Sequence, residues 1–118
     1  MKTLECSSRG DKRFSAFYAR LKKYNNQSIE TIYQNSKRTK DGKIPGKGKK
    51  VDYMLWEGKK YTPDCLSGLY EYLWKVYFKE NPNLLEYAKQ FDEFTDMFRG
   101  HCINCQADVI KKIVKEVK

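Results

Sequence analysis

The most regular hydrophobic pattern of the chain runs from Leu66 to Phe78. Apolar side chains recur there at steps of three and four residues, which is the period of an amphipathic α-helix. Thr62 is a candidate N-cap, and Pro63 suits the first helical position. We therefore expect a helix with one continuous buried stripe, formed by Leu66, Leu69, Tyr70, Leu73, Trp74, Tyr77 and Phe78.

Two more helices are expected on the C-terminal side of this stripe. The first starts at Asn81 and Pro82, and its apolar face carries Leu84, Leu85, Ala88 and Phe91. The apolar pattern continues to Gly100 through Phe94, Met97 and Phe98. The last helix runs from about Asn104, and the side chains expected to face inward are Ala107, Ile110, Ile113, Val114 and Val117.

The N-terminal half carries two shorter helical patterns. From Arg13 the spacing predicts a helix that Asn25 and Asn26 end, with the apolar positions Phe14, Phe17, Tyr18 and Leu21. Ser28 is a candidate N-cap for a second helix, which runs to about Lys37. Its inward positions are Ile29, Ile32 and Tyr33.

Strand signals are confined to two places. Lys2 to Ser8 is expected to form a short strand with Leu4 and Cys6 on one face, and Val51 to Tyr61 a hairpin that turns at Glu57 and Gly58. The predicted fold class is therefore mainly α with a minor β element. At 118 residues, we expect a single domain over residues 1–118.

Charge adds a distinct segment to this picture. The formal net charge is +9, and Lys37 to Lys50 holds seven basic residues against one acid. Glycines, a proline and the lack of an apolar period predict a mobile loop at about residues 38–50. Such a segment either binds phosphates of nucleotides, nucleic acids or anionic head groups, or simply keeps the loop solvated. The lysines placed to meet nucleic acid are Lys43, Lys47, Lys49 and Lys50. The loop is not a P-loop, because no Ser or Thr follows its Gly-Lys pairs.

Hydropathy and cysteine use suggest the compartment. No run approaches the roughly 20 apolar residues of a membrane span, so we expect a cytoplasmic protein with no membrane partner. The four cysteines are then reduced thiols or metal ligands.

Cys102 and Cys105 form a Cys-x-x-Cys beside His101. A structural zinc would need His101, Cys65 or Cys6 to complete four ligands. The alternatives are a reactive thiol at the start of the last helix or small buried cysteines. We expect no resident cofactor.

A polar group of residues lies within the second helical pattern. Glu30, Tyr33, Gln34 and Lys37 follow one another at steps of three, one and three residues, so they can share one helix face. A carboxylate, a phenol, an amide and an ammonium side by side make a usable binding site. The ordinary alternative is that Glu30 and Lys37 favour the two ends of the helix dipole.

The segment from Ser28 to Lys37 resembles the signature of NADAR domains, Ser-x-Glu-x-x-Tyr-Gln-x-x-Lys. Upstream, Phe14-Ser15-Ala16-Phe17-Tyr18 is similar to the Leu-Ser-Asn-Phe-Tyr segment of that family, with Ala16 in place of Asn. The resemblance covers residues 14–37. It implies a mostly helical fold that cleaves N-glycosidic bonds of riboflavin-pathway intermediates or of ADP-ribosylated guanine. Some phage-encoded members counter defence by ADP-ribosylation.

The resemblance also implies roles for individual residues. Glu30 is the first candidate for the carboxylate that stabilises oxocarbenium-like charge or activates water, and Asp96 the second. Lys37 would hold a phosphate or the oxygen of the leaving group. The remaining ligand-binding candidates are Arg13 for phosphate, Ser15 and Gln34 for positioning, and the rings of Phe17, Tyr18 and Tyr33.

Two other functions stay open beside the N-glycosidase. One is a nucleotide-binding protein without turnover, which would tolerate loss of Glu30. The other is a small nucleic-acid-binding protein that uses the Lys37–Lys50 segment and exposed tyrosines.

Overall fold

The computed structural model describes residues 2–7, 9–46, 48–95 and 106–117. The α-helices are α1 (Ile29–Asn35), α2 (Leu66–Glu80), α3 (Pro82–Ala88) and α4 (Gln106–Val117). Short 3-10 turns are η1 (Lys12–Phe14), η2 (Lys22–Tyr24) and η3 (Pro63–Cys65). The strands are β1 (Thr3–Glu5), β2 (Arg20–Leu21), β3 (Gln27–Ser28), β4 (Lys37–Arg38), β5 (Tyr53–Trp56), β6 (Lys59–Tyr61) and β7 (Glu93–Thr95).

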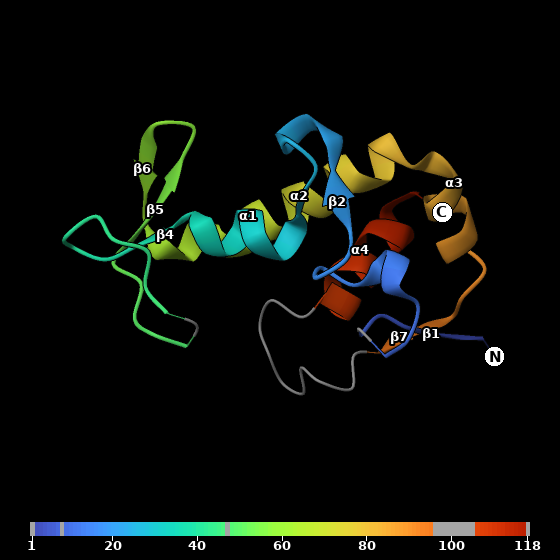
Figure 1. The fold of residues 1–118 in the computed structure, drawn as a ribbon. Coiled ribbons are helices and arrows are strands. Elements are labelled where there is room, and N and C mark those ends of the chain that lie inside the picture. Colours follow the sequence, from blue (N-terminus) through green and yellow to red (C-terminus); the bar gives the residue numbers. More distant parts are fainter. Residues whose placement is uncertain (1, 8, 47, 96–105, 118) are drawn as a thin grey trace.

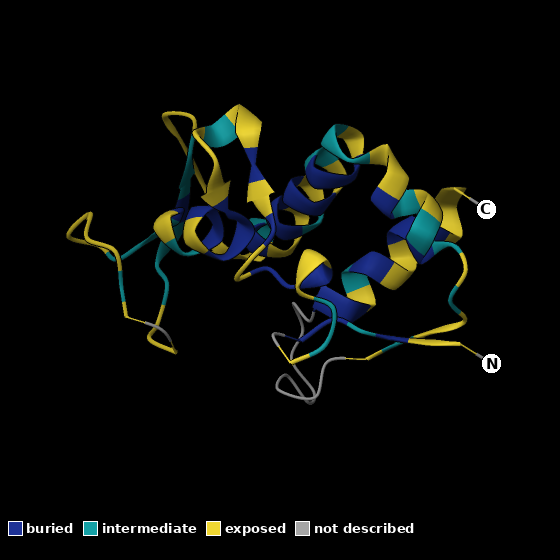
Figure 2. Ribbon diagram, turned by 45° about the vertical axis from the view of Figure 1, so that its right-hand side comes forward, coloured by how far each residue is buried: buried dark blue, intermediate teal, exposed yellow. Residues whose placement is uncertain are grey.

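Helix α2 is the central element, and α1, α3, α4 and β2 pack around it (Figure 1). All seven residues of its predicted stripe are buried, which confirms that prediction. The indole of Trp74 lies edge-on to Tyr77 and 5.9 Å from the ring of Phe78, and Phe78 in turn contacts Phe14 at 6.1 Å. Figure 2 shows the buried residues along α2 and α4, and exposed ones over the β5–β6 hairpin and the loop between β4 and β5. The core therefore follows α2.

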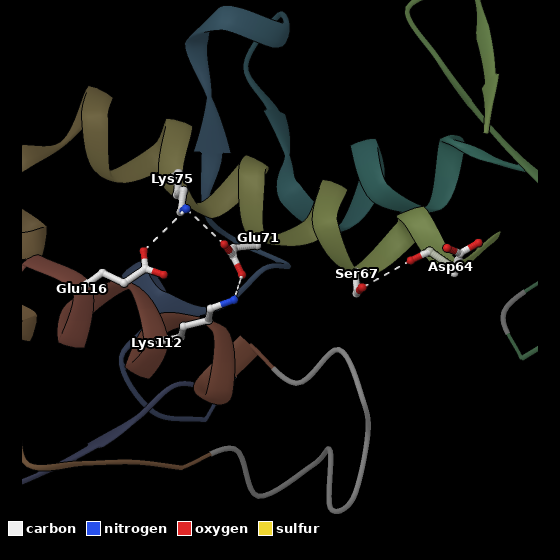
Figure 3. Close-up of polar contacts among 6 residues, drawn as sticks. All are labelled: Asp64, Ser67, Glu71, Lys75, Lys112 and Glu116. Atoms are coloured by element: carbon white, nitrogen blue, oxygen red, sulfur yellow. Dashed lines mark hydrogen bonds and ion pairs between the residues drawn. The ribbon is translucent and has the colours of Figure 1, made fainter. Parts of the chain in front are cut away.

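Ion pairs also join α2 to α4 (Figure 3). The carboxylate of Glu71 accepts from Lys112 of α4 at 2.8 Å and from Lys75 at 3.1 Å. Lys75 also lies 3.6 Å from Glu116. These contacts lie at the rim of the apolar contact between the two helices.

Within the described residues, the strands form three small sheets. β1 pairs with β7 in parallel, with Leu4 opposite Phe94. β2 and β3 are antiparallel, and β4, β5 and β6 form an antiparallel sheet. The predicted hairpin is confirmed. Its two-residue turn places Glu57 at φ 50° and Gly58 at φ 81°, the left-handed pair that favours tight hairpins.

The predicted fold class, mainly α, is wrong. Among the described residues 48% are helical and 18% lie in strands, so the fold is a mixture of α and β. The strands were underestimated because β2, β3 and β4 contain two residues each, too few to show an alternating pattern. β1 and β7 also pair although they are far apart in the sequence.

The helix expected from Arg13 to Leu21 is absent. The segment instead forms η1, a single turn over residues 15–19 and the strand β2, and Phe17 and Tyr18 are 45% and 50% exposed. Backbone groups that a helix would use are bonded elsewhere. The carbonyls of Ala16 and Ala19 accept the N–H groups of Glu30 and Ile29. Tertiary hydrogen bonds thus replaced the helical ones.

Other sequence predictions have mixed outcomes. The helix that starts at Pro82 and the last helix are both present. Val117, expected inward, is 44% exposed, and Phe94 lies in β7 rather than in a helical continuation. Leu4 and Cys6 are buried beside β1, as expected. Met97, Phe98 and Asn104 lie outside the described residues.

Candidate functional site

The two segments that carry the NADAR resemblance lie against each other. The turn of residues 15–19 is closed by the N–H of Ala19, which donates to the carbonyl of Ser15 at 2.8 Å. The first residues of α1 dock on this turn: Ile29 N–H donates to Ala19 and Glu30 N–H to Ala16, both at 2.9 Å. Ser28 caps α1, and its Oγ accepts the N–H of Thr31 at 3.1 Å. Two stretches separated along the chain therefore form one local unit.

Glu30 is the buried carboxylate of this unit. It is 7% exposed, and Gln34, one turn later on α1, donates from Nε2 to its Oε2 at 2.7 Å. A carboxylate so far from water needs hydrogen-bond partners, and Gln34 supplies one of them. The amide also fixes the direction of the carboxylate. Sequence spacing had placed these two residues on one face, and that prediction is confirmed.

Ser15 adds a second buried polar group. The side chain is fully buried, and its Oγ has no hydrogen-bond partner among the described residues. Buried hydroxyls are normally bonded, so Ser15 Oγ keeps an unused capacity for a hydrogen bond. The next residue, Ala16, donates its N–H to Oε1 of Gln106 at 2.6 Å, which ties the turn to α4. Sequence reasoning missed Gln106, since nothing in its spacing links it to residue 16.

Lys37 does not lie on the helix face predicted for it. Helix α1 ends at Asn35, and Ser36 closes it by donating from Oγ to the carbonyl of Tyr33 at 2.6 Å. Lys37 then belongs to β4, opposite Met54 of β5. Its ammonium lies over the ring of Tyr33, 4.8 Å from the centroid. The predicted neighbours Tyr33 and Lys37 therefore do meet, through a cation–π contact rather than a shared helix face.

Tyr33 itself belongs to the core as much as to the site. It is 7% exposed, and its ring packs against Tyr70 of α2 at 5.0 Å. Lys37, Tyr33 and Tyr70 thus form a row of contacts from β4 into the core, in which the two rings are tilted against each other. This packing favours a positioning role for the Tyr33 ring.

Arg13 is held by Asp11 and by the ring of Tyr87. Its guanidinium donates to Asp11 in a bidentate pair at 2.9 and 2.7 Å and lies 4.7 Å over the ring of Tyr87 on α3. The hydrogen bond from Arg13 holds the pKa of Asp11 below its usual range. These contacts direct Arg13 toward α3. Of the other aromatic candidates, Tyr18 is exposed and the ammonium of Lys12 lies 5.0 Å over its ring.

Several candidates fall outside the described residues: Asp96, Lys47, His101, Cys102 and Cys105. Of the remaining cysteines, Cys6 is buried and Cys65 half-buried. Among residues 2–7, 9–46, 48–95 and 106–117 no three His, Cys, Asp or Glu side chains gather in a way that could hold a metal ion.

The basic loop between β4 and β5 has local structure at its start. A turn at Gly42, whose φ is +79°, brings the N–H of Thr39 to the carbonyl of Lys43 at 2.8 Å. Lys40 N–H donates to Asp52 at 2.9 Å across the loop. Lys43, Lys49 and Lys50 are exposed. In Figure 1 the loop reaches away from the helices.

Sequence reasoning also missed a group of residues around the outer side of α2. Lys23 Nζ donates to the hydroxyl of Tyr72 at 3.2 Å, and the hydroxyls of Tyr24 and Tyr72 are 3.0 Å apart. The ring of Trp56 packs against both tyrosines. The only signal in the sequence is that Tyr72 lies outside the apolar stripe of α2.

No protein-family model matches this chain, and a search of curated proteins finds no similar one. In the described part of the chain, no helix has both the length and the apolar character needed to cross a membrane.

Proposed function

We propose that this protein is an N-glycosidase that acts on a nucleotide or an ADP-ribosyl adduct. The observation that carries the proposal is the position of Glu30: a buried carboxylate, directed by Gln34 and docked through its backbone on the turn of residues 15–19. The NADAR resemblance, which rests on these same two segments, suggests the reaction. Removal of ADP-ribose from guanine would let the protein counter defence by ADP-ribosylation.

The proposed chemistry needs little beyond a placed carboxylate. As the bond from the sugar C1 to the base nitrogen breaks, positive charge builds on the sugar, and the carboxylate of Glu30 stabilises it. Water adds to C1 and loses a proton to Glu30. The base leaves with the bonding electrons and takes up a proton from solvent, to which Glu30 returns the one it received. Ser15 Oγ provides a hydrogen bond for the sugar or the base. Lys37, fixed over Tyr33, meets a phosphate or the leaving oxygen.

The test compares the parent protein with Glu30→Gln and with Glu86→Gln, an exposed glutamate on α3 as matched control. Each is incubated with nucleotides, NAD, flavin-pathway intermediates and DNA that carries ADP-ribosylated guanine. Released base and free ADP-ribose are measured by chromatography. Release by the parent and the control, reduced at least about 100-fold in Glu30→Gln, supports the proposal. Equal release by all three contradicts the role of Glu30.

A nucleotide-binding protein without turnover is the second candidate. Ala16 is fully buried at the position where the NADAR pattern has Asn, so a polar group of that pattern is replaced by a methyl. No released product, together with a nucleotide retained by both the parent and Glu30→Gln after desalting, favours this function over the enzyme.

The third candidate is nucleic-acid binding by the β4–β5–β6 sheet and its basic loop. Lys60 of β6 lies 4.9 Å over the ring of Tyr53 on β5, and Tyr61 is 37% exposed. Basic and aromatic side chains combined in this way bind phosphates and stack on bases. This function predicts affinity that falls steeply with salt and does not change in Glu30→Gln.

A further inference from the structure

The outer face of α2 bounds a cavity of about 460 Å³. The residues that line it from α2 are spaced three and four apart, so they share one face of the helix, and Lys23 of η2 lines another side of the cavity. The lining residues are Lys23, Tyr72, Lys75, Val76, Lys79 and Glu80. This volume lies in the range of small-molecule sites, roughly 300–1,000 Å³. The cavity belongs neither to the Glu30 unit nor to the basic loop.

The charges around this cavity favour an anion. Three ammonium groups line it against the single carboxylate of Glu80. That carboxylate is already engaged, because its two oxygens accept the N–H groups of Lys22 and Lys23 at 2.9 and 3.0 Å. Glu80 therefore holds η2 against α2, and with three lysines to one glutamate the lining residues carry a net positive charge.

The three lysines differ in what holds them. Lys75 is fixed at one edge by Glu71 and Glu116, as Figure 3 shows. Lys23 is fixed at another edge by the hydroxyl of Tyr72. Lys79 makes no hydrogen bond or ion pair with any described residue, so its ammonium is the one most available to a ligand.

An aromatic ring lies beside these charges. Tyr72 is 37% exposed, and its hydroxyl is held by Tyr24 and Lys23. Trp56 packs edge-on against the ring at 6.4 Å. Its hydrogen bonds with Tyr24 and Lys23 also lower the pKa of Tyr72. A ring fixed in this way offers a flat surface on which a base can pack.

We propose that this cavity is a binding site for a nucleotide unit, with the phosphate on Lys79 and Lys23 and the base against Tyr72. The unit comes either from a free mononucleotide or from a single strand of nucleic acid, since both present the same phosphate and base. This site is independent of the proposed N-glycosidase function.

The test is calorimetric titration of the parent protein with AMP, adenosine, inorganic phosphate and a five-nucleotide single strand. The variants are Lys79→Glu, Lys23→Met, Tyr72→Leu and Glu30→Gln, with Lys115→Glu as matched control because this exposed lysine lies on α4. Lys79→Glu and Lys23→Met are expected to weaken AMP or strand binding at least about tenfold, with Lys115→Glu unchanged. Tyr72→Leu is expected to weaken AMP more than inorganic phosphate.

The remaining outcomes are equally decisive. Binding of AMP assigns the site to free nucleotides, and binding of the strand alone assigns it to nucleic acid. Absence of binding by the parent to both overturns the proposal. Equal losses in Lys79→Glu and Lys115→Glu overturn it in favour of diffuse charge. A loss in Glu30→Gln as large as in Lys79→Glu places the ligand at Glu30 instead, so the two proposals fail separately.

Discussion

The backbone N–H of Glu30 donates to the carbonyl of Ala16 at 2.9 Å, which joins a helix to a turn that precedes it by more than ten residues. The N–H of Ala16 in turn donates to Gln106 at the start of α4. Ala16 thus connects the turn of residues 15–19 to α1 through its carbonyl and to α4 through its N–H. The position of the candidate carboxylate therefore depends on a side chain near the other end of the chain.

This dependence predicts the effect of Gln106→Leu. The substitution removes the acceptor of a buried N–H and leaves that group unsatisfied, which costs about 1–3 kcal/mol. In urea, the free energy of unfolding of Gln106→Leu should be lower than that of the parent by this amount. Gln106→Glu keeps an acceptor oxygen, so its free energy of unfolding should differ from that of Gln106→Leu. Gln90→Leu, at an exposed position, is the control. A loss in Gln90→Leu equal to that in Gln106→Leu would mean that the buried hydrogen bond contributes nothing.

Two substitutions in the turn between β5 and β6 should change the stability of the protein in opposite directions. Glu57 has φ 50° and Gly58 φ 81°, where Asn and Gly are preferred. Glu57→Asn should therefore stabilise the protein, and Gly58→Ala should destabilise it by about 1 kcal/mol or more. No heavy atom lies within 4 Å of a Cβ added at Gly58, so backbone strain alone is responsible. Thermal melts of the two variants should shift in opposite directions; shifts of the same sign contradict the argument.

These two regions show what the sequence can predict. The stripe of α2 spans four turns of helix, so its period is clear, and Ser28 is found as a cap from its residue type and position. The Glu57–Gly58 turn is likewise local. Glu30 and Gln34 share a helix face because α1 forms as expected. Each of these features depends on residues a few positions apart.

The features that were missed depend on distant partners. The Arg13–Leu21 spacing fits a helix, but the carbonyls of Ala16 and Ala19 are bonded to the start of α1. Lys37 leaves the helix because α1 stops at Asn35 and β4 pairs with β5. Lys23 and Tyr72 are 49 residues apart in the sequence, so no local pattern predicts their contact. Tertiary hydrogen bonds thus overrode local propensity.

Tyr77 predicts how the protein responds to alkali. The side chain is 6% exposed, and burial raises its pKa to about 12. The unfolded chain ionises this phenol near pH 10, so its contribution to stability is complete below about pH 10 and is lost as the pH rises toward 12. In Tyr77→Phe the free energy of unfolding should fall less steeply over this window than in the parent. Tyr61→Phe, at an exposed position, should follow the parent; identical slopes in all three contradict the prediction.

Glu71 predicts the response to acid. Hydrogen bonds from Lys112, which has the larger effect, and from Lys75 hold the pKa of Glu71 below its usual range. The stability that these contacts provide is therefore present above the unfolded value of about 4.3 and is lost as the pH falls through the lower folded value. Glu71→Gln should lower the melting temperature at about pH 7 by less than about 5 °C, because the pairs are exposed. At a pH below that folded value the carboxylate is protonated in both states, so the parent should melt at the temperature of the variant.

The control for Glu71 is Glu93→Gln, an exposed carboxylate on β7. This variant has about the same total charge as Glu71→Gln. The difference between its melting temperatures at pH 7 and in acid should nevertheless equal that of the parent. High salt offers a second measurement, because screening weakens exposed ion pairs and should shrink the deficit of Glu71→Gln at neutral pH. A deficit that is the same in acid, in salt and at neutral pH would show that Glu71 acts through the packing of α2 on α4, and that the ion pairs add nothing to the contact between these helices.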